Sequence, residues 1–527
     1  MRIAALDLGS NSFHLLVVEV RPDGSFVPIV REKEMLRLGD VVAREGVLTD
    51  EALEGAVDAL RRFRSIAESN GADELAAYGT AALREAANGA PAVERLERES
   101  GVRVKVISGV REAQLIFEAV RASVLIEPGP ALSADLGGGS LELSVGDRSG
   151  LVYATSLRLG VGRLTTELVH SDPPSPKDLG RVRRRVAEGL GKVLREISEF
   201  SPRQLIGSSG TFGALIRAAA AERDGALPAV SNQLTVSAKE LGALAEKVYA
   251  SSAAERAKLP GIDARRAELL PAGMALTTVL MEAGGFEEIT WSEWALREGI
   301  VLSLLRKHDR ADFGDDPRAI RRASVLSLCR RSSWRERHGR EVARLACELF
   351  DATASLHRLG SADRELLELA ALLHDIGEHV SRDGHARHTA YLIENGGLRG
   401  FTPDEVMLLS VLGRYHTRGK PRQTSLSWES LGDEDRDRAL KLLSLLRIAD
   451  GLDVGHAGVV SAVEAVISED DVEIVVTARG DAELERWMFQ RKKELFEEVF
   501  KHRTELWVTA AGHDEFEAMA GGSTGLG

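Results

Sequence analysis

The sequence predicts an α/β protein with two similar domains, followed by an all-α region and a small α+β module. The clearest observation is the stretch 131–145, ALSADLGGGSLELSV, which is typical of a strand, a tight turn and a second strand. Residues 3–19, IAALDLGSNSFHLLVVE, repeat this pattern. Their aspartates, Asp7 and Asp135, stand about 130 residues apart, which is too far for a solenoid repeat, so we expect two domains that face one cleft. The alternative is a pair of ordinary hairpin turns.

Length and charge limit the possible functions. The 527 residues suffice for three or four domains, and the net charge of −13 argues against general binding to nucleic acid. A polyanionic substrate therefore requires a local basic cleft, with arginines near the glycine turns. The two cysteines, Cys329 and Cys347, lack metal-site spacing, so we expect both to be buried in a reducing, cytoplasmic protein. We expect neither a signal peptide nor insertion into a membrane.

The turn that follows Asp135 has the composition of a phosphate loop. Glycine leaves the backbone free to turn, so that N–H groups can converge on an anion. The residues that can do this are Gly137, Gly138, Gly139 and Ser140. Asp135 before the turn and Glu142 after it would supply hard oxygen ligands for Mg²⁺, the ion that accompanies phosphates.

The rest of the first domain is predicted as a helix over 49–69, a strand over 75–78 and a helix over 110–123. Arg84 follows the strand, from where it can either contact a phosphate in the cleft or lie on the surface. Glu112 stands in the first turn of the last helix. There a carboxylate serves either as an N-terminal cap or as a general base that orients water.

In the second domain we expect a strand over 157–164, a basic helix over 178–197 and a strand that enters a Gly/Ser loop over 205–211. The loop offers backbone N–H groups and hydroxyls for a second phosphate or a nucleoside, through Ser209, Gly210 and Thr211. Arg297 can reach the cleft from the segment that closes this domain.

Five motifs together resemble the exopolyphosphatase and guanosine pentaphosphate phosphatase (Ppx/GppA) family. They are DLGSNSFH at 7–14, SGxxEA at 108–113, DLGGGSLE at 135–142, GSSGT at 207–211 and LREG at 296–299. The resemblance covers roughly the first 305 residues, with all motifs in order. It implies an actin-like ATPase fold of two RNase-H-like domains, over 1–126 and 127–305, with the active site between them.

The resemblance also implies roles for individual residues. Glu112 would be the catalytic base, and Asp7, Asp135 and Glu142 would bind Mg²⁺, with K⁺ as a further candidate ion. The phosphates would be held by Ser10, Asn11, Arg84, Gly137, Gly138, Gly139, Ser140, Ser209, Gly210, Thr211 and Arg297.

Residues 306–458, which include an acidic linker at 309–317, are predicted to be helical. Their order of ligand-type residues, H…HD…D, resembles a metal-binding HD phosphohydrolase domain. This resemblance implies a second site for a divalent metal such as Mn, Fe, Zn or Mg, formed by His338, His374, Asp375, His388, His416 and Asp450. The alternative is a helical scaffold that lengthens the substrate channel and supports a homodimer.

Residues 459–510 are predicted as the small α+β module, with strands over 463–467, 471–477 and 505–508 and a helix over 482–500. The tail over 511–527 is rich in Gly and Ala and is predicted to be disordered.

The predicted function is that of an exopolyphosphatase, which releases terminal orthophosphate from inorganic polyphosphate. A guanosine pentaphosphate (pppGpp) 5′-phosphohydrolase shares the same motifs and is the close alternative. Two further alternatives come from other classes. A non-catalytic (p)ppGpp-binding regulator would not need the carboxylates of Glu112, Asp135 and Glu142, and a sugar-kinase-like protein would need ATP and an acceptor.

Overall fold

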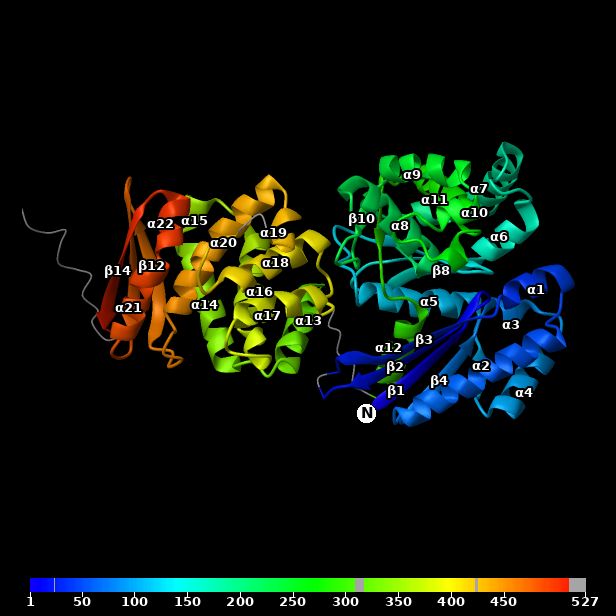
Figure 1. The fold of residues 1–527 in the computed structure, drawn as a ribbon, viewed down its shortest axis with the longest axis horizontal. Coiled ribbons are helices and arrows are strands. Elements are labelled where there is room, and N and C mark those ends of the chain that lie inside the picture. Colours follow the sequence, from blue (N-terminus) through cyan, green and yellow to red (C-terminus); the bar gives the residue numbers. More distant parts are fainter. Residues whose placement is uncertain (23, 309–316, 422–424, 511–527) are drawn as a thin grey trace, which may run out of the picture. The chain divides into compact units, whose positions relative to one another are not determined.

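The structure, a computed structural model, describes residues 1–22, 24–308, 317–421 and 425–510 (Figure 1). The chain divides into two compact units. The first contains residues 1–321 and 399–403, and the second contains the described residues from 322 onward apart from 399–403. The predicted tail and all of the predicted linker except Pro317 lie outside the described residues.

The first sheet of the first unit has the strand order β3-β2-β1-β4-β5. Its antiparallel half consists of β1 (Arg2–Leu8), β2 (Ser12–Val20) and β3 (Phe26–Met35). Its parallel half continues from β1 through β4 (Glu74–Gly79) and β5 (Val104–Val106). The pattern of residues 3–19 thus forms two paired strands, whose apolar side chains are almost all buried.

The second sheet repeats this arrangement with one additional strand, in the order β10-β11-β9-β6-β7-β8. Its antiparallel half consists of β6 (Ala131–Leu136), β7 (Leu141–Gly146) and β8 (Leu151–Leu157). Its other strands are β9 (Gln204–Ser208), β11 (Glu288–Trp291) and the edge strand β10 (Thr235–Ser237). Asp7 and Asp135 are each the penultimate residue of the first strand of their sheet. This duplication confirms the predicted fold of two RNase-H-like α/β domains.

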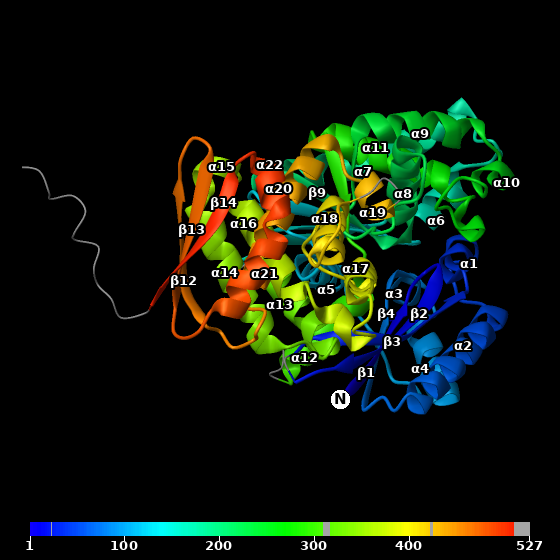
Figure 2. The ribbon, with the colours of Figure 1, turned by 60° about the vertical axis from the view of Figure 1, so that its left-hand side comes forward.

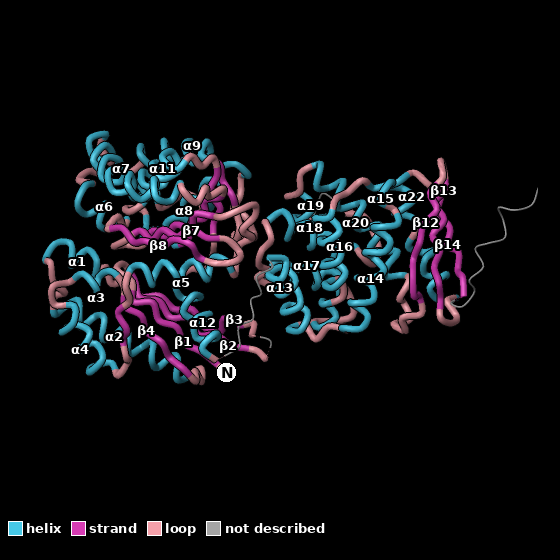
Figure 3. Tube along the Cα trace, turned by 180° about the vertical axis from the view of Figure 1, so that it is seen from behind, coloured by secondary structure: helices cyan, strands magenta, loops and turns pink. Residues whose placement is uncertain are grey.

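Helices cover the faces of both sheets (Figure 3). With the first sheet lie α1 (Leu38–Glu45), α2 (Asp50–Ser69), α3 (Ala81–Glu85), α4 (Gly89–Ser100), α5 (Gly109–Arg121) and α12 (Leu296–Lys307). With the second sheet lie α6 (Val161–Leu168), α7 (Pro176–Ser198), α8 (Ser209–Asp224), α9 (Ala238–Ala250), α10 (Ala253–Arg256) and α11 (Leu270–Gly284). Helix α5 packs on β7 and β8, so it lies between the two sheets.

The strand predicted over 157–164 is wrong. β8 ends at Leu157, and α6 begins at Val161. The reason is a close approach of two backbones, because a Cβ atom on Gly160 would lie 2.2 Å from the carbonyl carbon of Gly139. The backbone N–H of Val161 donates to the Gly137 carbonyl at 2.9 Å. The start of α6 is therefore held against the glycine turn, and an extended strand would not reach it.

The helical part of the second unit matches the predicted all-α region. Its helices are α13 (Pro317–Arg331), α14 (Glu336–Ala352), α15 (Ala354–His357), α16 (Ser361–Leu373), α17 (His385–Asn395), α18 (Pro403–Tyr415), α19 (Leu426–Glu429) and α20 (Asp433–Gly451), with a 3₁₀ turn over Ile376–His379. Both cysteines are free and buried, as predicted.

A three-stranded sheet with two helices follows in the second unit (Figure 2). The strands are β12 (Val460–Ile467), β13 (Asp471–Ala478) and β14 (Arg503–Ala510), and the helices are α21 (Glu483–Lys492) and α22 (Glu494–Phe500). The helix predicted over 482–500 is therefore interrupted, at Lys493. Within the described ranges, no helix is both long and apolar enough to cross a membrane.

Candidate functional site

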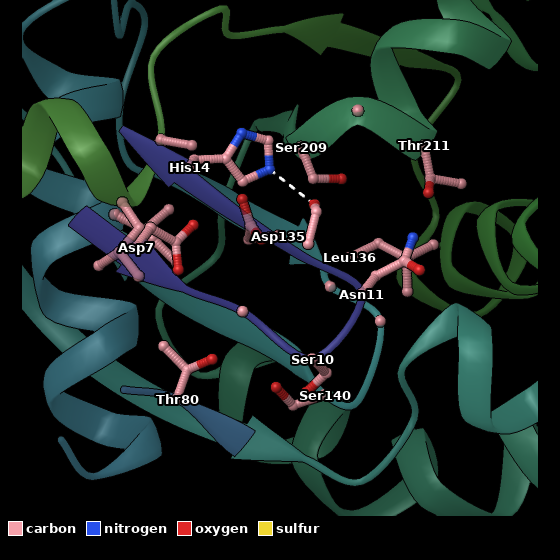
Figure 4. Close-up of a pocket in the computed structure, with 18 of the residues that line it drawn as sticks. Asp7, Ser10, Asn11, His14, Thr80, Asp135, Leu136, Ser140, Ser209 and Thr211 are labelled. Carbon is pink, nitrogen blue, oxygen red and sulfur yellow. Dashed lines mark hydrogen bonds between the residues drawn. The ribbon is translucent and has the colours of Figure 1, made fainter. Parts of the chain in front are cut away.

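Two turns, 9–11 after Asp7 and 137–140 after Asp135, are called the aspartate turns below. A cavity of about 300 Å³ lies in the first unit, where these two turns meet. Every predicted phosphate or metal residue of the first unit lines it except Arg84 and Glu142. Figure 4 shows Ser10 and Asn11 of the first turn beside Leu136 and Ser140 of the second, with Asp7 and Asp135 on the neighbouring strands. The internal repeat therefore places its two copies on one cavity.

Glycine is required where the two turns touch. A Cβ atom on Gly138 would lie 2.9 Å from Asn11 Cβ and 3.1 Å from the Asn11 backbone nitrogen. A Cβ atom on Gly139 would lie 2.7 Å from Ser10 Oγ. Real Cβ atoms essentially never come within 3.0 Å of another heavy atom in this way, so glycine is what lets the turns come together. The second turn is closed by the Gly137 N–H, which donates to the Ser140 carbonyl at 3.0 Å.

Four carboxyl groups lie close together here: those of Asp7, Glu112 and Asp135 line the cavity, and that of Glu142 lies beside it. Glu112, Asp135 and Glu142 are buried, and Asp7 is half-buried. Antiparallel pairing of β6 with β7 places Asp135 directly opposite Glu142. Burial raises the pKa of Asp7 to about 7, and burial raises the pKa of Asp135 to about 6. Burial and the neighbouring Asp135 raise the pKa of Glu142 to about 7, and burial together with Glu142 raises the pKa of Glu112. The group thus carries more negative charge than its surroundings neutralise.

Hydrogen bonds from hydroxyl groups hold two of these carboxylates in place. Ser208 Oγ donates to Asp135 Oδ2 at 2.5 Å, and Ser156 Oγ donates to Glu142 Oε1 at 2.8 Å. Neither hydroxyl brings a positive charge. The carboxylates are therefore oriented without being neutralised, which leaves them free to bind a cation.

Glu112 does not cap its helix. The hydroxyl of Ser108 performs that role and accepts from the Arg111 N–H at 3.2 Å. The Glu112 carboxylate instead lines the cavity and accepts a hydrogen bond from Arg84 Nη1 at 3.0 Å. Arg84 also donates to the Ile107 carbonyl at 2.8 Å. The structure thus places Arg84 behind Glu112, where it orients the carboxylate.

The Gly/Ser loop over 207–211 supplies the opposite wall of the cavity. Helix α8 begins at Ser209 itself, whose φ of 85° lies in the left-handed region that costs energy for a residue other than glycine. The Ser209 hydroxyl is buried and finds no hydrogen-bond partner among the described residues. A buried hydroxyl without a partner is costly, so this one is suited to a ligand oxygen in the cavity.

Sequence reasoning missed several cationic groups beside this loop. Arg266 lines the cavity, and its guanidinium occupies the space beside Gly210, 2.2 Å from where a Cβ would lie. Burial lowers the pKa of Arg266, and burial together with Arg266 lowers the pKa of Lys33 to about 8. Arg31 lines the same cavity. No sequence motif marks these residues, although Arg31 and Lys33 alternate along one strand and so share a face.

His14, the last residue of the first motif, also lines the cavity. Its Nε2 lies 2.8 Å from Ser12 Oγ (Figure 4), and burial together with Arg297 lowers its pKa. The ring is therefore neutral and positions Ser12 rather than carrying charge.

The histidines and aspartates predicted in the helical region also converge, in the second unit. His338, His374 and Asp450 form one group of possible metal ligands, and Asp375, His385 and His416 form another. His388 belongs to neither group, and His385 takes the place expected for it. The two residues are one turn apart on α17, about 4.5 Å along the helix axis, and the sequence does not fix which turn faces the cluster.

Comparison with known proteins agrees with this geometry. The profile of the Ppx/GppA phosphatase family matches residues 16–308, and the profile of Ppx/GppA phosphatase domain III matches residues 320–484. Exopolyphosphatase 1 of Mycobacterium leprae is 35% identical over 348 residues, which are 66% of this chain and 97% of the relative. Guanosine-5′-triphosphate,3′-diphosphate pyrophosphatase of Aeromonas hydrophila is 31% identical over 450 residues, which are 85% of this chain and 86% of the relative.

Solved structures give the same result for the first unit. A crystal structure of an exopolyphosphatase from Cytophaga hutchinsonii aligns with a TM-score of 0.55 at 30% identity, over 58% of this chain and 98% of that chain. The Ppx/GppA family member of Aquifex aeolicus aligns with a TM-score of 0.51 at 25% identity, over 59% of this chain and 99% of that chain. The two-domain fold, the paired aspartate turns and the matched profiles lead to one conclusion, that the chain belongs to the Ppx/GppA phosphatase family.

Proposed function

We propose that the chain is an exopolyphosphatase that hydrolyses the terminal phosphoanhydride of inorganic polyphosphate and releases orthophosphate. The observation that carries this proposal is that the two aspartate turns, the cluster of carboxylates and the Ser209 hydroxyl, which has no hydrogen-bond partner among the described residues, meet at one cavity. Members of the family hydrolyse phosphoanhydrides, and relatives named exopolyphosphatase are matched over nearly their whole length. Hydrolysis of a linear polyanion fits a cavity bordered by Arg31, Arg266 and Arg297.

The carboxylates fit a divalent cation. Burial raises the pKa of all three, the neighbouring Asp135 raises those of Asp7 and Glu142 further, and a hard cation would offset both effects. Oxygen ligands are the kind that Mg²⁺ prefers, so Asp7, Asp135 and Glu142 would hold Mg²⁺. When bound, the ion supplies charge neutralisation for the transferring phosphoryl group.

The chain's own groups account for the remaining steps. Backbone N–H groups of the two aspartate turns and the Ser209 hydroxyl bind the oxygens of the terminal phosphate. Glu112 takes a proton from water while the water oxygen bonds to phosphorus and the bridging P–O bond breaks. The shortened polyphosphate leaves with the electron pair of that bond. Arg84 holds Glu112 in one orientation throughout, through its bond to the carboxylate.

Exchange of Glu112 tests this assignment. Glu112→Gln keeps the shape of the side chain and loses its basicity, so release of orthophosphate from long polyphosphate should fall at least about 100-fold. Glu118→Gln on the same helix is the matched control, because Glu118 pairs with Arg306 away from the cavity. Activity of Glu112→Gln within a few-fold of Glu118→Gln would disprove the role of Glu112 as base.

A second candidate substrate is pppGpp, which would lose its terminal 5′-phosphate in the same reaction. The match to the guanosine pyrophosphatase of Aeromonas hydrophila extends over both units and favours this candidate. Orthophosphate release from polyphosphate and from pppGpp, measured side by side with one preparation, decides between them. A higher kcat/KM for pppGpp would replace the first proposal by the second. The homodimer and the cytoplasmic location stay predictions.

A further inference from the structure

The cluster of histidines and aspartates in the second unit has a geometry that packing alone does not explain. It brings together residues of three helices, α14, α17 and α20, and residues just past the ends of two others, α16 and α18. In sequence order these residues are His338, His374, Asp375, His385, His416 and Asp450. His338, His374 and His416 are almost fully buried, whereas the side chains of Asp375 and His385 keep 21% of their surface exposed. The cluster is therefore closed on one side and open on the other.

Each of the four imidazoles is anchored through Nδ1. His338 Nδ1 lies 2.8 Å from Asp453 Oδ2, and His374 Nδ1 lies 2.6 Å from the Ala371 carbonyl. The other two Nδ1 atoms, those of His385 and His416, lie 3.0 Å and 2.8 Å from the carbonyls of Arg382 and Gly413. Carbonyl and carboxylate oxygens only accept, so every Nδ1 must carry the proton. In the neutral ring, Nε2 then holds a lone pair that is directed into the cluster.

These lone pairs lie close together in two pairs. His338 Nε2 and His374 Nε2 are 3.2 Å apart, and His385 Nε2 and His416 Nε2 are 3.3 Å apart. Two lone pairs at such distances repel unless a cation lies beside them. Ligands that bind one metal ion at about 2.1 Å are themselves roughly 3 to 3.5 Å apart, which is close to the separations seen here.

The aspartates complete both pairs. Asp450 Oδ1 lies 3.7 Å from His338 Nε2 and 3.8 Å from His374 Nε2. Asp375 serves both pairs, because its Oδ2 lies 3.5 Å from His374 Nε2 while its Oδ1 lies 3.2 Å from His416 Nε2 and 3.3 Å from His385 Nε2. One carboxylate with an oxygen directed to each histidine pair is the arrangement expected of a bridging ligand between two ions.

We infer that this cluster holds two transition-metal ions bridged by Asp375, and that the open coordination positions on the His385 side bind a phosphate ester for hydrolysis. Imidazole and carboxylate ligands together suit Mn, Fe, Co or Zn better than Mg. The ion of His385 and His416 has only three protein ligands, which leaves positions for water and for a substrate oxygen. The ammonium group of Lys492, which contacts Asp450 Oδ2, adds positive charge next to the pair.

The reaction at this site would need only the phosphate ester and one water molecule as reactants. The metal ions would lower the pKa of a water molecule, whose oxygen would bond to phosphorus and whose proton would pass to the leaving oxygen. The ester P–O bond breaks, and the alcohol leaves with the electron pair and takes up a proton. The products are the alcohol and a phosphate with one ester bond fewer. This chemistry uses none of the residues of the first-unit cavity.

Metal content tests the site directly. Protein saturated with CoCl₂ in excess MgCl₂ and freed of unbound cobalt should hold two Co²⁺ ions per chain, because Mg²⁺ fills the oxygen ligands of the first unit. His385→Gln should reduce the content to one ion. The matched control is His388→Gln on the same helix, which should retain two. A wild-type content of one ion or none, or equal contents in the two variants, overturns the inference.

A second variant keeps all six ligands. Asp453→Asn removes only the acceptor charge behind His338, and the affinity for Co²⁺ should fall about 10- to 100-fold, as is usual for partners of metal-bound histidines. Hydrolysis is measured in the Glu112→Gln background, with p-nitrophenyl phosphate and bis(p-nitrophenyl) phosphate. One of these esters should be hydrolysed, and adding His385→Gln should reduce the rate at least tenfold. Cobalt binding without hydrolysis of either ester overturns the assigned chemistry.

Discussion

Buried carboxylates have opposite pKa shifts in the two units. In the cavity of the first unit, burial raises the pKa of Asp7 to about 7 and that of Asp135 to about 6. In the cluster of the second unit, burial acts in the same direction and is outweighed. Lys492 and His374 lower the pKa of Asp450 to about 2, and His374, His385 and His416 hold the pKa of Asp375 far below its usual range.

The difference lies in what accompanies each carboxylate. Hydroxyl groups and other carboxylates surround Asp135 and Glu142, so their charge remains uncompensated. Imidazoles and an ammonium group surround Asp375 and Asp450. A site of the first kind gains most from a hard cation that arrives with a polyanion, whereas a site of the second kind already contains the nitrogen ligands that retain a softer ion. If both proposals hold, one chain carries two phosphate-related sites that require different metals.

The largest expected effect comes from removing a charge in the first unit. Asp135→Asn keeps the contact with Ser208 and removes one anionic oxygen, so orthophosphate release should fall at least about 100-fold and the Mg²⁺ concentration for half-maximal rate should rise. The cobalt content of the second unit should not change. His374→Ala is the converse variant, with lost cobalt and retained release from polyphosphate. A Mg²⁺ response in Asp135→Asn equal to that of wild type would contradict the contrast between the two sites.

The next effect concerns how closely the two turns of the cavity meet. Gly138→Ala would place a Cβ 3.1 Å from the Asn11 nitrogen and push the turns apart, and displacement of about 1 Å can cost 100-fold in rate. Gly180→Ala is the control, because Gly180 is exposed on α7 with nothing within 4 Å of its Cβ position. Alanine there should raise helix stability slightly and leave the rate unchanged. Equal rates in the two variants would show that close contact of the turns is not needed.

The parts of these sites that could be predicted are those encoded in contiguous segments. The aspartate turns, the helix over 110–123 and the Gly/Ser loop follow from local chemistry, because glycine freedom and strand alternation act over a few residues. Arg266 and Lys33 could not be predicted, since tertiary folding alone brings Arg266 to Gly210 and Lys33 close to Arg266. The prediction named His388, whereas His385 joins the cluster, and the cause is similar. Which turn of α17 faces the cluster depends on how that helix packs.

A smaller effect is expected from the arginines beside the cavity. Arg266→Ala removes a cation that lines the cavity, so KM for long polyphosphate should rise about tenfold with little change in kcat. Arg265→Ala is the control, because Arg265 is exposed and pairs with Asp263 at 2.9 Å. The metal content of the second unit should be the same in both variants. A KM for Arg266→Ala equal to that of Arg265→Ala would show that bound polyphosphate does not contact Arg266.

The smallest effect concerns a buried carboxylate that belongs to neither site. Asp178 completes the capping box of α7, where Ser171 Oγ and Ser175 Oγ donate to its Oδ2 at 2.6 Å and 2.7 Å. These bonds from Ser171 and Ser175 hold its pKa well below the usual range. A pKa that is lowered by folding contributes stability above the unfolded value of about 4, and this stability is lost as the pH falls below it.

Asp178→Asn should therefore reduce stability at pH 7 by about 1 kcal/mol, the usual contribution of such a cap, and should do so less at pH 3.5. The measurement is the shift in Tm of the variant relative to wild type at both pH values. Orthophosphate release and cobalt content should equal those of wild type, since Asp178 contacts neither site. A Tm shift that does not depend on pH would mean that shape, rather than charge, stabilises this helix start.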